Sequence, residues 1–217
     1  HIDFLDEQVE AISDEIVQRL EAMSRPPATP AAPQPPSDQP DSQPASEQAP
    51  PTATEAVALL DTIPGINQTL AEVIVAELGT DMARFPTAKH AAAWAGLAPG
   101  NNQSGGKRLS SRIRQGNRAL RSGLIQAAWA AARTKETYLA AQYRHLVGRR
   151  GKKRAIVAVA HSILVIAYHM LLRHEPYREA GGNYFDQRKK ESVVNRLTRR
   201  LENLGYSVRI EPIAKAA

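Results

Sequence analysis

A serine followed by two glycines and a run of cations is the part of this sequence best suited to chemistry. In "SGGKRLSSRIRQGNRALR", Ser104 directly precedes Gly105 and Gly106, and Lys107 follows them. Glycines let a backbone approach a ligand closely, and adjacent cations stabilise an anionic transition state. These residues are suited to attack by a hydroxyl group on a phosphate.

The residues alone leave the nucleophile open. Serine is a weak nucleophile unless a base activates it, and the sequence identifies no such base. Ser-Gly pairs are common in turns, so a plain turn hydroxyl is the simpler interpretation of Ser104. Ser110 and Ser111 meet the same chemical criteria nearly as well.

Two clusters of cations predict contacts with nucleic acid phosphates. Few aromatic side chains lie among them, so backbone contacts are favoured over base stacking. Cations at the start of a helix oppose its dipole, and an external anion would relieve that arrangement. A solvated basic surface is the alternative. The predicted phosphate-binding residues, in addition to the two glycines, are Lys107, Arg108, Arg112, Arg114, Arg118, Arg121, Lys152, Lys153 and Arg154.

The stretch "LLDTIPGINQTLAEVIVAELG", residues 59–79, predicts a helix-hairpin-helix. A glycine in the turn permits the backbone angle that a tight turn needs. Exposed amides at the start of the second helix would face an anion such as a DNA phosphate. An ordinary helical turn is the alternative. The predicted DNA-binding residues here are Pro64, Gly65, Ile66, Asn67 and Thr69.

No metal site is predicted in these 217 residues. Four acids do not make a two-metal carboxylate cluster and are interpreted as helix caps and solvated helix faces: Asp61, Glu72, Glu77 and Asp81. The histidines show no ligand spacing beyond His161 and His169, which lie eight residues apart. We interpret them as core or surface histidines.

Helices must position these candidate residues. Alanine-rich helical patterns recur at about 54–61, 68–79, 87–95, 116–133, 135–147 and 153–173. The last pattern is apolar, but it is at the short limit for a membrane span, and His161, Ser162 and His169 interrupt it. We predict a central buried helix and no membrane association.

The first 24 residues predict a coiled-coil helix. Apolar residues recur at steps of mostly three and four, with acids between them: Ile2, Leu5, Val9, Ile12, Ile16, Leu20 and Met23. A surface helix of a soluble domain is the alternative. We favour self-association into a homo-oligomer, because no core follows locally.

The segments on either side of the main helical region differ from it in composition. Residues 25–53 contain most of the chain's prolines and predict a disordered linker. Residues 179–217 form a basic C-terminal extension with a helix at about 187–204, and "GYSVRIEP" is compatible with a short strand. The predicted fold class is mostly α, with one helical domain at 54–178.

Charge is distributed unevenly along the chain. Residues 1–60 carry eleven acids and two basic residues, whereas residues 101–154 carry fourteen basic residues and one acid. An anionic partner is therefore expected for the central region. The chain has no cysteine, which excludes disulfides and is typical of a reducing compartment.

Three stretches together resemble a known family. The 59–79 stretch, "FPTAKHAAAWAGLAPGNNQSGGKR" and "GNRALRSGLIQAAWAAAR" are similar to the C-terminal domain of DEDD-type insertion-sequence transposases, relatives of the Piv DNA invertase. The match in motif order covers about 55–175, and the coiled coil matches in kind. The resemblance implies DNA transposition or site-specific recombination by a cytoplasmic, nucleoid-associated bacterial protein.

The resemblance also implies roles for particular residues. The family's nucleophilic serine falls on Ser104, which would attack a DNA phosphodiester and form a transient phosphoserine link. In the family a RuvC-like half supplies four acids that bind Mg²⁺. No such half is visible in these residues, so we expect this chain to be inactive alone. DNA is the implied partner, and a guide RNA is a candidate partner because some members use a bridge RNA. A non-catalytic, oligomerising DNA- or RNA-binding module is the alternative.

Overall fold

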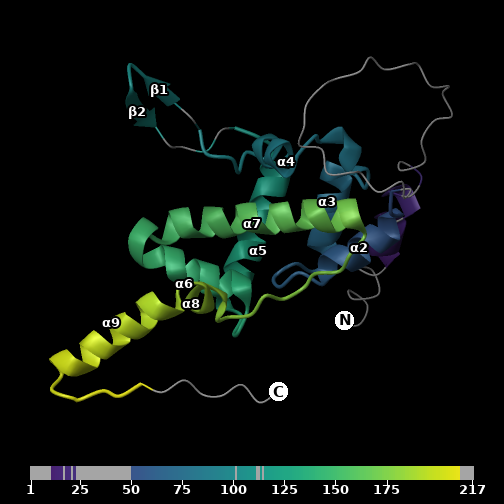
Figure 1. The fold of residues 1–217 in the computed structure, drawn as a ribbon. Helices are drawn as coiled ribbons and strands as arrows, with labels where there is room; N and C mark the ends of the chain where they lie inside the picture. Colours follow the sequence, from purple (N-terminus) through teal and green to yellow (C-terminus); the bar gives the residue numbers. More distant parts are fainter. Residues whose placement is uncertain are drawn as a thin grey trace, which may run out of the picture.

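The computed structural model describes residues 11–16, 18–20, 22, 50–100, 102–110, 113 and 115–210. These residues are mostly helical, as predicted, with one short β-hairpin (Figure 1). The elements are α2 (Ala53–Asp61), α3 (Gln68–Leu78), the 3-10 turn η1 (Met82–Arg84), α4 (Ala88–Trp94), β1 (Asn102–Ser104), β2 (Lys107–Ser110), α5 (Arg118–Arg133), α6 (Tyr138–Arg150), α7 (Lys152–Arg173), α8 (Tyr184–Arg188) and α9 (Lys190–Asn203).

Polar side chains define where several helices begin. Thr52 and Glu55 form a reciprocal capping box at the start of α2. Asn67, Asn117 and Thr137 each accept a hydrogen bond from a backbone N–H in the first turn of α3, α5 and α6. These caps satisfy amides that have no partner within the helix, so the sequence determines the helix starts locally.

The helix α7 is the centre of the domain, as predicted. It contacts α2, α4, α5, α6 and η1, and Figure 1 shows it running through the middle of the molecule. Ile163 and Leu164 are fully buried, and Ala128 and Ala131 of α5 are buried with them in one core. The small alanine side chains let α5 pack closely. By length and composition α7 could cross a membrane, but 56% of its apolar window is buried inside the protein.

The turn between α2 and α3 packs against α5. Gly65 has φ +93°, and a Cβ at this position would lie 2.4 Å from the Ala127 carbonyl oxygen and 2.8 Å from the Ala131 amide nitrogen. A side chain therefore does not fit between the turn and the backbone of α5. The two helices and their turn lie where they were predicted, whereas their assignment as a DNA-binding helix-hairpin-helix stays a prediction.

The helices α6 and α7 meet at one residue. Gly151 is both the C-cap of α6 and the N-cap of α7, with φ +78°. The cations Lys152, Lys153 and Arg154 follow it directly and are exposed. We call these three residues the basic corner.

A segment after α7, residues 174–183 (the strap), returns along this helix to the start of α6. Glu179 fixes the strap, because its Oε1 atom accepts hydrogen bonds from the Tyr138 and Gly181 backbone N–H groups at 2.7 and 2.8 Å. The Tyr177 N–H donates to Thr62 Oγ1 at 3.1 Å. Burial, with Glu179 nearby, raises the pKa of Tyr177 above its ordinary value. The strap thereby ties the end of α2 to the start of α6.

The two ends of the chain differ from the predictions in part. Residues 1–10, 17, 21 and 23–49 lie outside the described residues, and so do those parts of the predicted coiled coil and linker. The predicted helix at 187–204 is divided at Lys189 into α8 and α9. The expected strand in "GYSVRIEP" is wrong over its described part: residues 206–210 have no regular structure, because no neighbouring strand pairs with them.

Candidate functional site

The predicted nucleophile lies on a β-hairpin that projects from the helical domain (Figure 1). Strands β1 and β2 are antiparallel, and Gly105 and Gly106 form the two-residue turn between them, with φ +56° and +75°. Positive φ at both central residues is typical of the type I′ turn, which glycine adopts without strain. Glycine is therefore favoured at both central positions by the turn itself.

Ser104 and Lys107 are directly opposite each other in the hairpin register, and both are exposed. Side chains of directly opposed residues in an antiparallel pair lie on the same face, with Cβ atoms about 4.5–5.5 Å apart. The turn thus places an ammonium group beside a hydroxyl group, both open to solvent. Arg108 occupies the register position opposite Gln103.

The base of the hairpin is closed against α4. A Cβ on Gly116 would lie 2.3 Å from the Gly96 amide nitrogen and 2.5 Å from the Trp94 carbonyl oxygen. The two ends of the hairpin segment therefore approach each other backbone to backbone. A bridge between Pro99 and Ile113 extends this pairing towards the strands.

Asn117 connects this base to three helices. Its backbone N–H donates to the Trp94 carbonyl at the end of α4 at 3.1 Å. Its Oδ1 atom accepts from the Leu120 N–H at 2.9 Å, which caps α5, and its Nδ2 atom donates to the Glu77 carboxylate of α3. One side chain therefore positions the point from which the hairpin leaves the domain.

The predicted phosphate-binding cations lie in three places. Lys107 is on the hairpin, and Arg118 and Arg121 are in the first turns of α5, next to the hairpin base. The basic corner begins α7 and has no acidic residue in its first turn. Arg112 and Arg114 lie outside the described residues.

The α2–α3 turn is separate from the hairpin. It packs on Ala127 and Ala131, near the C-terminal end of α5, whereas Arg118 begins that helix. Residues 118 and 129 of one helix are about 16 Å apart along its axis, at 1.5 Å per residue. The structure therefore does not bring these two predicted DNA-binding regions together at one point.

Within this turn the exposed and buried residues are clearly divided. Ile66 is buried, and its N–H donates to the Ile63 carbonyl at 3.0 Å. Pro64 and Gly65 are half-buried, whereas Asn67 and Thr69 are exposed. The exposed start of α3 is the part of the turn that a DNA backbone can reach.

The acids and histidines form no metal site in the described part of the chain, where no three His, Asp or Glu side chains gather. Asp81 caps η1, as predicted. Glu72 corrects the prediction of a solvated helix face, because it is buried and accepts a hydrogen bond from Gln68 at 3.2 Å. Burial lowers the pKa of His161 and His169, so both histidines are more readily neutral than in water.

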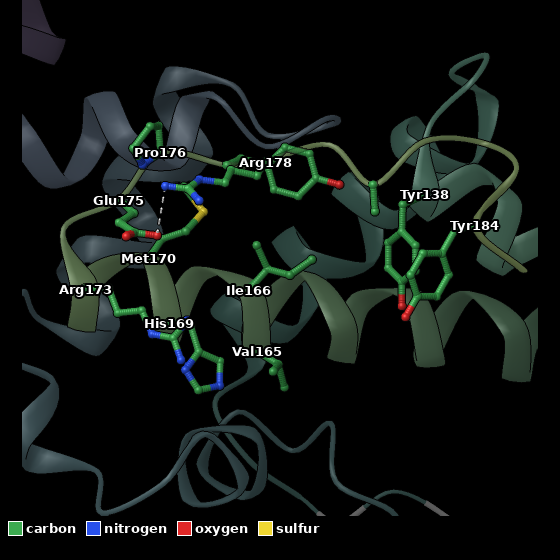
Figure 2. Close-up of a pocket in the computed structure, with 12 residues that line it drawn as sticks. Tyr138, Val165, Ile166, His169, Met170, Arg173, Glu175, Pro176, Arg178 and Tyr184 are labelled. Atoms are coloured by element: carbon green, nitrogen blue, oxygen red, sulfur yellow. Dashed lines mark ion pairs between the residues drawn. The ribbon is translucent and has the colours of Figure 1, made fainter. Parts of the chain in front are cut away.

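A groove of about 470 Å³ lies between α7 and the strap, away from the hairpin (Figure 2). Ile166 and Met170 are among its apolar lining residues, and Tyr138 and Tyr184 lie together at one end of it, with Arg173 at the other. The Nδ1 atom of His169 is buried without a hydrogen-bond partner among the described residues. The residues that line the groove include none of the predicted site residues.

Sequence reasoning missed two functional features of this site. The first is the hairpin, whose signal was a Gly-Gly pair between two short polar runs. The second is the Asn117–Glu77 pair, which joins residues 40 positions apart. Asn117 had the local signal of an N-cap, but its partner on α3 had none.

Comparison with known proteins places most of these features in one domain. Residues 57–144 match the family model described as "Transposase IS116/IS110/IS902 family". These residues, which include the hairpin and the α2–α3 turn, are therefore similar to a transposase domain of that family. This match agrees with the predicted resemblance to insertion-sequence transposases.

Individual relatives agree with the family match. The chain is 33% identical over 130 residues to the transposase for insertion sequence element IS1111A of Coxiella burnetii, covering 58% of this chain and 35% of that protein. It is also 33% identical over 131 residues to the pilin gene-inverting protein of Moraxella bovis, covering 58% and 40%. The chain therefore spans about two fifths or less of the length of these curated relatives.

Proposed function

We propose that this chain takes part in DNA transposition or site-specific recombination, with Ser104 as the nucleophile that cleaves a DNA strand. The observation that carries the proposal is the pairing of exposed Ser104 with exposed Lys107 across a two-glycine turn. The pairing lies inside the residues that match a transposase family. DNA is the proposed substrate, and a guide RNA is a further proposed partner.

The geometry suits attack on a phosphodiester. A nucleophile on a projecting turn reaches the DNA backbone without clashes from the helical domain, and the glycines present no side chain to obstruct the approach. Nothing lies within 4 Å of a Cβ built on Gly105 or Gly106. The Lys107 ammonium would neutralise the charge that accumulates on the phosphate oxygens.

The proposed step conserves the number of phosphate ester bonds. The Ser104 Oγ atom forms a bond to phosphorus, and the bond between phosphorus and one deoxyribose oxygen breaks. The serine proton passes to water, and the released deoxyribose oxygen takes up a proton. A later attack by a deoxyribose hydroxyl on the phosphoserine reverses these bond changes and joins the strand to a new end.

The cations away from the hairpin have a binding role in this proposal. Arg118 and Arg121 at the hairpin base and the basic corner would hold phosphates on either side of the attacked bond. Phosphate contacts fix the position of a protein on DNA without reading its sequence. The exposed start of α3 is a further proposed backbone contact.

The family's Mg²⁺ has no place in this step. The described residues do not supply a cluster of acids that fits the ion. We therefore assign the metal-binding acids of the family to a RuvC-like part and derive no chemistry from them here. The chain's own contribution is the nucleophile and the phosphate contacts.

A non-catalytic nucleic-acid-binding module is the second candidate. One observation favours it: among the described residues, no side chain forms a hydrogen bond with the Ser104 hydroxyl that would activate it. Serine without a base is a weak nucleophile. A binding module would use the same cations but would not need the serine.

The two candidates differ in whether they form a covalent adduct with DNA. The chain is mixed with DNA that carries the element's ends, together with a RuvC-like partner and Mg²⁺, and adducts are separated on a denaturing gel. We expect an adduct that Ser104→Ala reduces at least about 10³-fold, as expected for removal of a nucleophile. Binding to DNA should change little.

Two control variants sharpen the assay. Ser110→Ala removes the alternative hydroxyl from the same hairpin and should leave the adduct intact. Lys107→Arg should retain more adduct than Lys107→Gln, because the charge is preserved. An adduct that persists in Ser104→Ala would overturn the role of this serine, and salt-sensitive binding without any adduct would favour the binding module.

A further inference from the structure

The helix α9 has an apolar face that nothing in the described part of the chain covers. Leu197, Leu201 and Leu204 have exposed fractions of 51%, 42% and 67%, and α9 has no buried residue. With Val194 these leucines are spaced three, four and three residues apart, which is the spacing of a coiled-coil seam. A soluble helix with such a stripe normally packs it against a partner.

Near its start α9 is joined to the domain through α8. Phe185 of α8 stacks on Tyr138 and on His145 of α6, with ring centroids 5.5 and 5.0 Å apart. From this anchor α9 extends away from the core, and among the helices it contacts α8 (Figure 1). Its apolar stripe is therefore presented at a fixed place on the outside of the domain.

A second exposed seam lies at the other end of the described chain. In the N-terminal helix (residues 11–16, 18–20 and 22), Ile12 and Ile16 have exposed fractions of 56% and 37%. Leu20 of the same helix is buried in the domain core. The core thus holds one end of the helix while the seam beyond it stays uncovered.

Charge indicates which seam pairs with which. Residues 1–24 carry seven acids and one basic residue, Arg19, which forms an ion pair with Glu15. The helix α9 itself carries four basic residues and two acids. The acidic N-terminal stretches of two copies carry the same sign of charge, whereas such a stretch and α9 carry opposite signs, so charge favours the mixed pair.

The two seams of one molecule do not face each other. Figure 1 shows the N-terminal helix beside α2 on one side of the core and α9 on the opposite side. A second copy related by a two-fold axis places its own N-terminal helix at α9 and its own α9 at the N-terminal helix. In the resulting closed dimer, both seams of both copies are covered.

We propose that the chain forms a two-fold symmetric dimer in which the apolar stripe of α9 packs against the acidic N-terminal helix of a second copy. This contact uses an extension that lies outside the family match at residues 57–144. It does not depend on the proposed strand cleavage. Each contact is short, so the two symmetric contacts together provide the affinity.

The test is the mass of the chain in solution, measured by sedimentation across a range of protein concentrations. We expect about twice the chain mass of 23.7 kDa for the unchanged protein. Leu197→Asp with Leu201→Asp should shift the mass to that of a single chain, and so should Ile12→Asp with Ile16→Asp. All four positions are exposed, so these variants should retain the helical circular dichroism of the unchanged protein.

Mixing these two double variants separates the proposal from self-pairing of the N-terminal helix. Each variant retains the seam that the other has lost, so the mixture should recover a dimer with one contact, weaker than the unchanged dimer. Asn195→Asp with Asn203→Asp adds the same charge to α9 outside the stripe and should leave the dimer intact. High salt should weaken the dimer.

Three results would overturn the proposal. If the Leu197 and Leu201 variant dimerises like the unchanged protein, the N-terminal helices pair with each other. A mixture that stays monomeric would show that the two seams do not meet. An unchanged protein that is monomeric throughout, with DNA binding lost in the Leu197 and Leu201 variant and kept in the asparagine control, would make α9 a nucleic-acid-binding helix.

Discussion

The hairpin at 102–110 and the turn between α2 and α3 use glycine for opposite reasons. At Gly65 a Cβ would collide with the backbone of α5, whereas at Gly106 nothing lies within 4 Å. The first glycine serves packing in the core, and the second lets a projecting turn form without occupying the space around Ser104. Stability and the proposed chemistry are therefore built in different parts of the domain, and Asn117 joins them.

The largest expected effect is the loss of stability in Gly65→Ala. The new methyl group adds overpacking against α5, typically 1–3 kcal/mol. Positive φ adds about 1–2 kcal/mol for any L residue. We expect a loss of about 3 kcal/mol in the free energy of unfolding, or roughly 6–12 °C in Tm for a domain of this size, measured by thermal unfolding.

Gly106→Ala is the matched change in the hairpin. Its φ is also positive, but the methyl group enters open space, so the expected cost is about 1 kcal/mol of local turn strain. Tm should change little, while adduct formation at Ser104 should fall because the turn is distorted. Equal losses of Tm in the two variants would contradict the separation of core and hairpin.

Asn117→Ala tests the junction between the two regions. Loss of an N-cap costs about 1 kcal/mol, and loss of the bond to Glu77 adds to it, so we expect about 1.5 kcal/mol in stability. Amide exchange in the hairpin should also become faster, because its base is less firmly held. Asn67→Ala removes a cap from α3 and should lower stability without changing exchange in the hairpin.

The smallest expected effect on stability has the opposite sign. Neutralising the basic corner with Lys152→Gln, Lys153→Gln and Arg154→Gln removes cations that oppose the dipole of α7, and should raise stability by about 1 kcal/mol in total. The same variant should bind DNA more weakly, with a salt dependence reduced by up to about three counterions.

A control for this variant lies across the same joint. Arg149→Gln with Arg150→Gln removes cations from the last turn of α6, where they favour the dipole. This change should lower stability by a few tenths of a kcal/mol. If neutralising the basic corner leaves both Tm and the salt dependence of DNA binding unchanged, these cations neither destabilise α7 nor contact DNA phosphates.

Helical structure was predictable because its signals are local. The patterns at 54–61 and 153–173 agree with α2 and α7 to within one residue at each end, since caps and apolar spacing lie within each segment. The break at Lys189 escaped prediction because no proline or glycine marks it. The expected strand near the C-terminus was wrong, since a strand needs a partner that the sequence alone does not reveal.

The candidate site was predictable in chemistry and not in geometry. Ser104, the glycines and Lys107 were identified from residue type, and the family resemblance agreed with the match to the transposase family. The direct pairing of Ser104 with Lys107 depends on hairpin register, which two strands of three and four residues are too short to indicate by alternation. The contact between Asn117 and Glu77 is long-range and left no pattern.

The single-residue joint at Gly151 has a mechanical consequence. A 22-residue helix spans about 33 Å, so α7 is a continuous rigid element from the basic corner to the strap. No loop separates α6 from α7. A displacement of the basic corner would therefore be transmitted along α7 to the four helices that pack against it, α2, α4, α5 and α6. A DNA strand bound at the basic corner would therefore displace the whole helical domain, whereas a strand bound at the hairpin would first bend the hairpin itself.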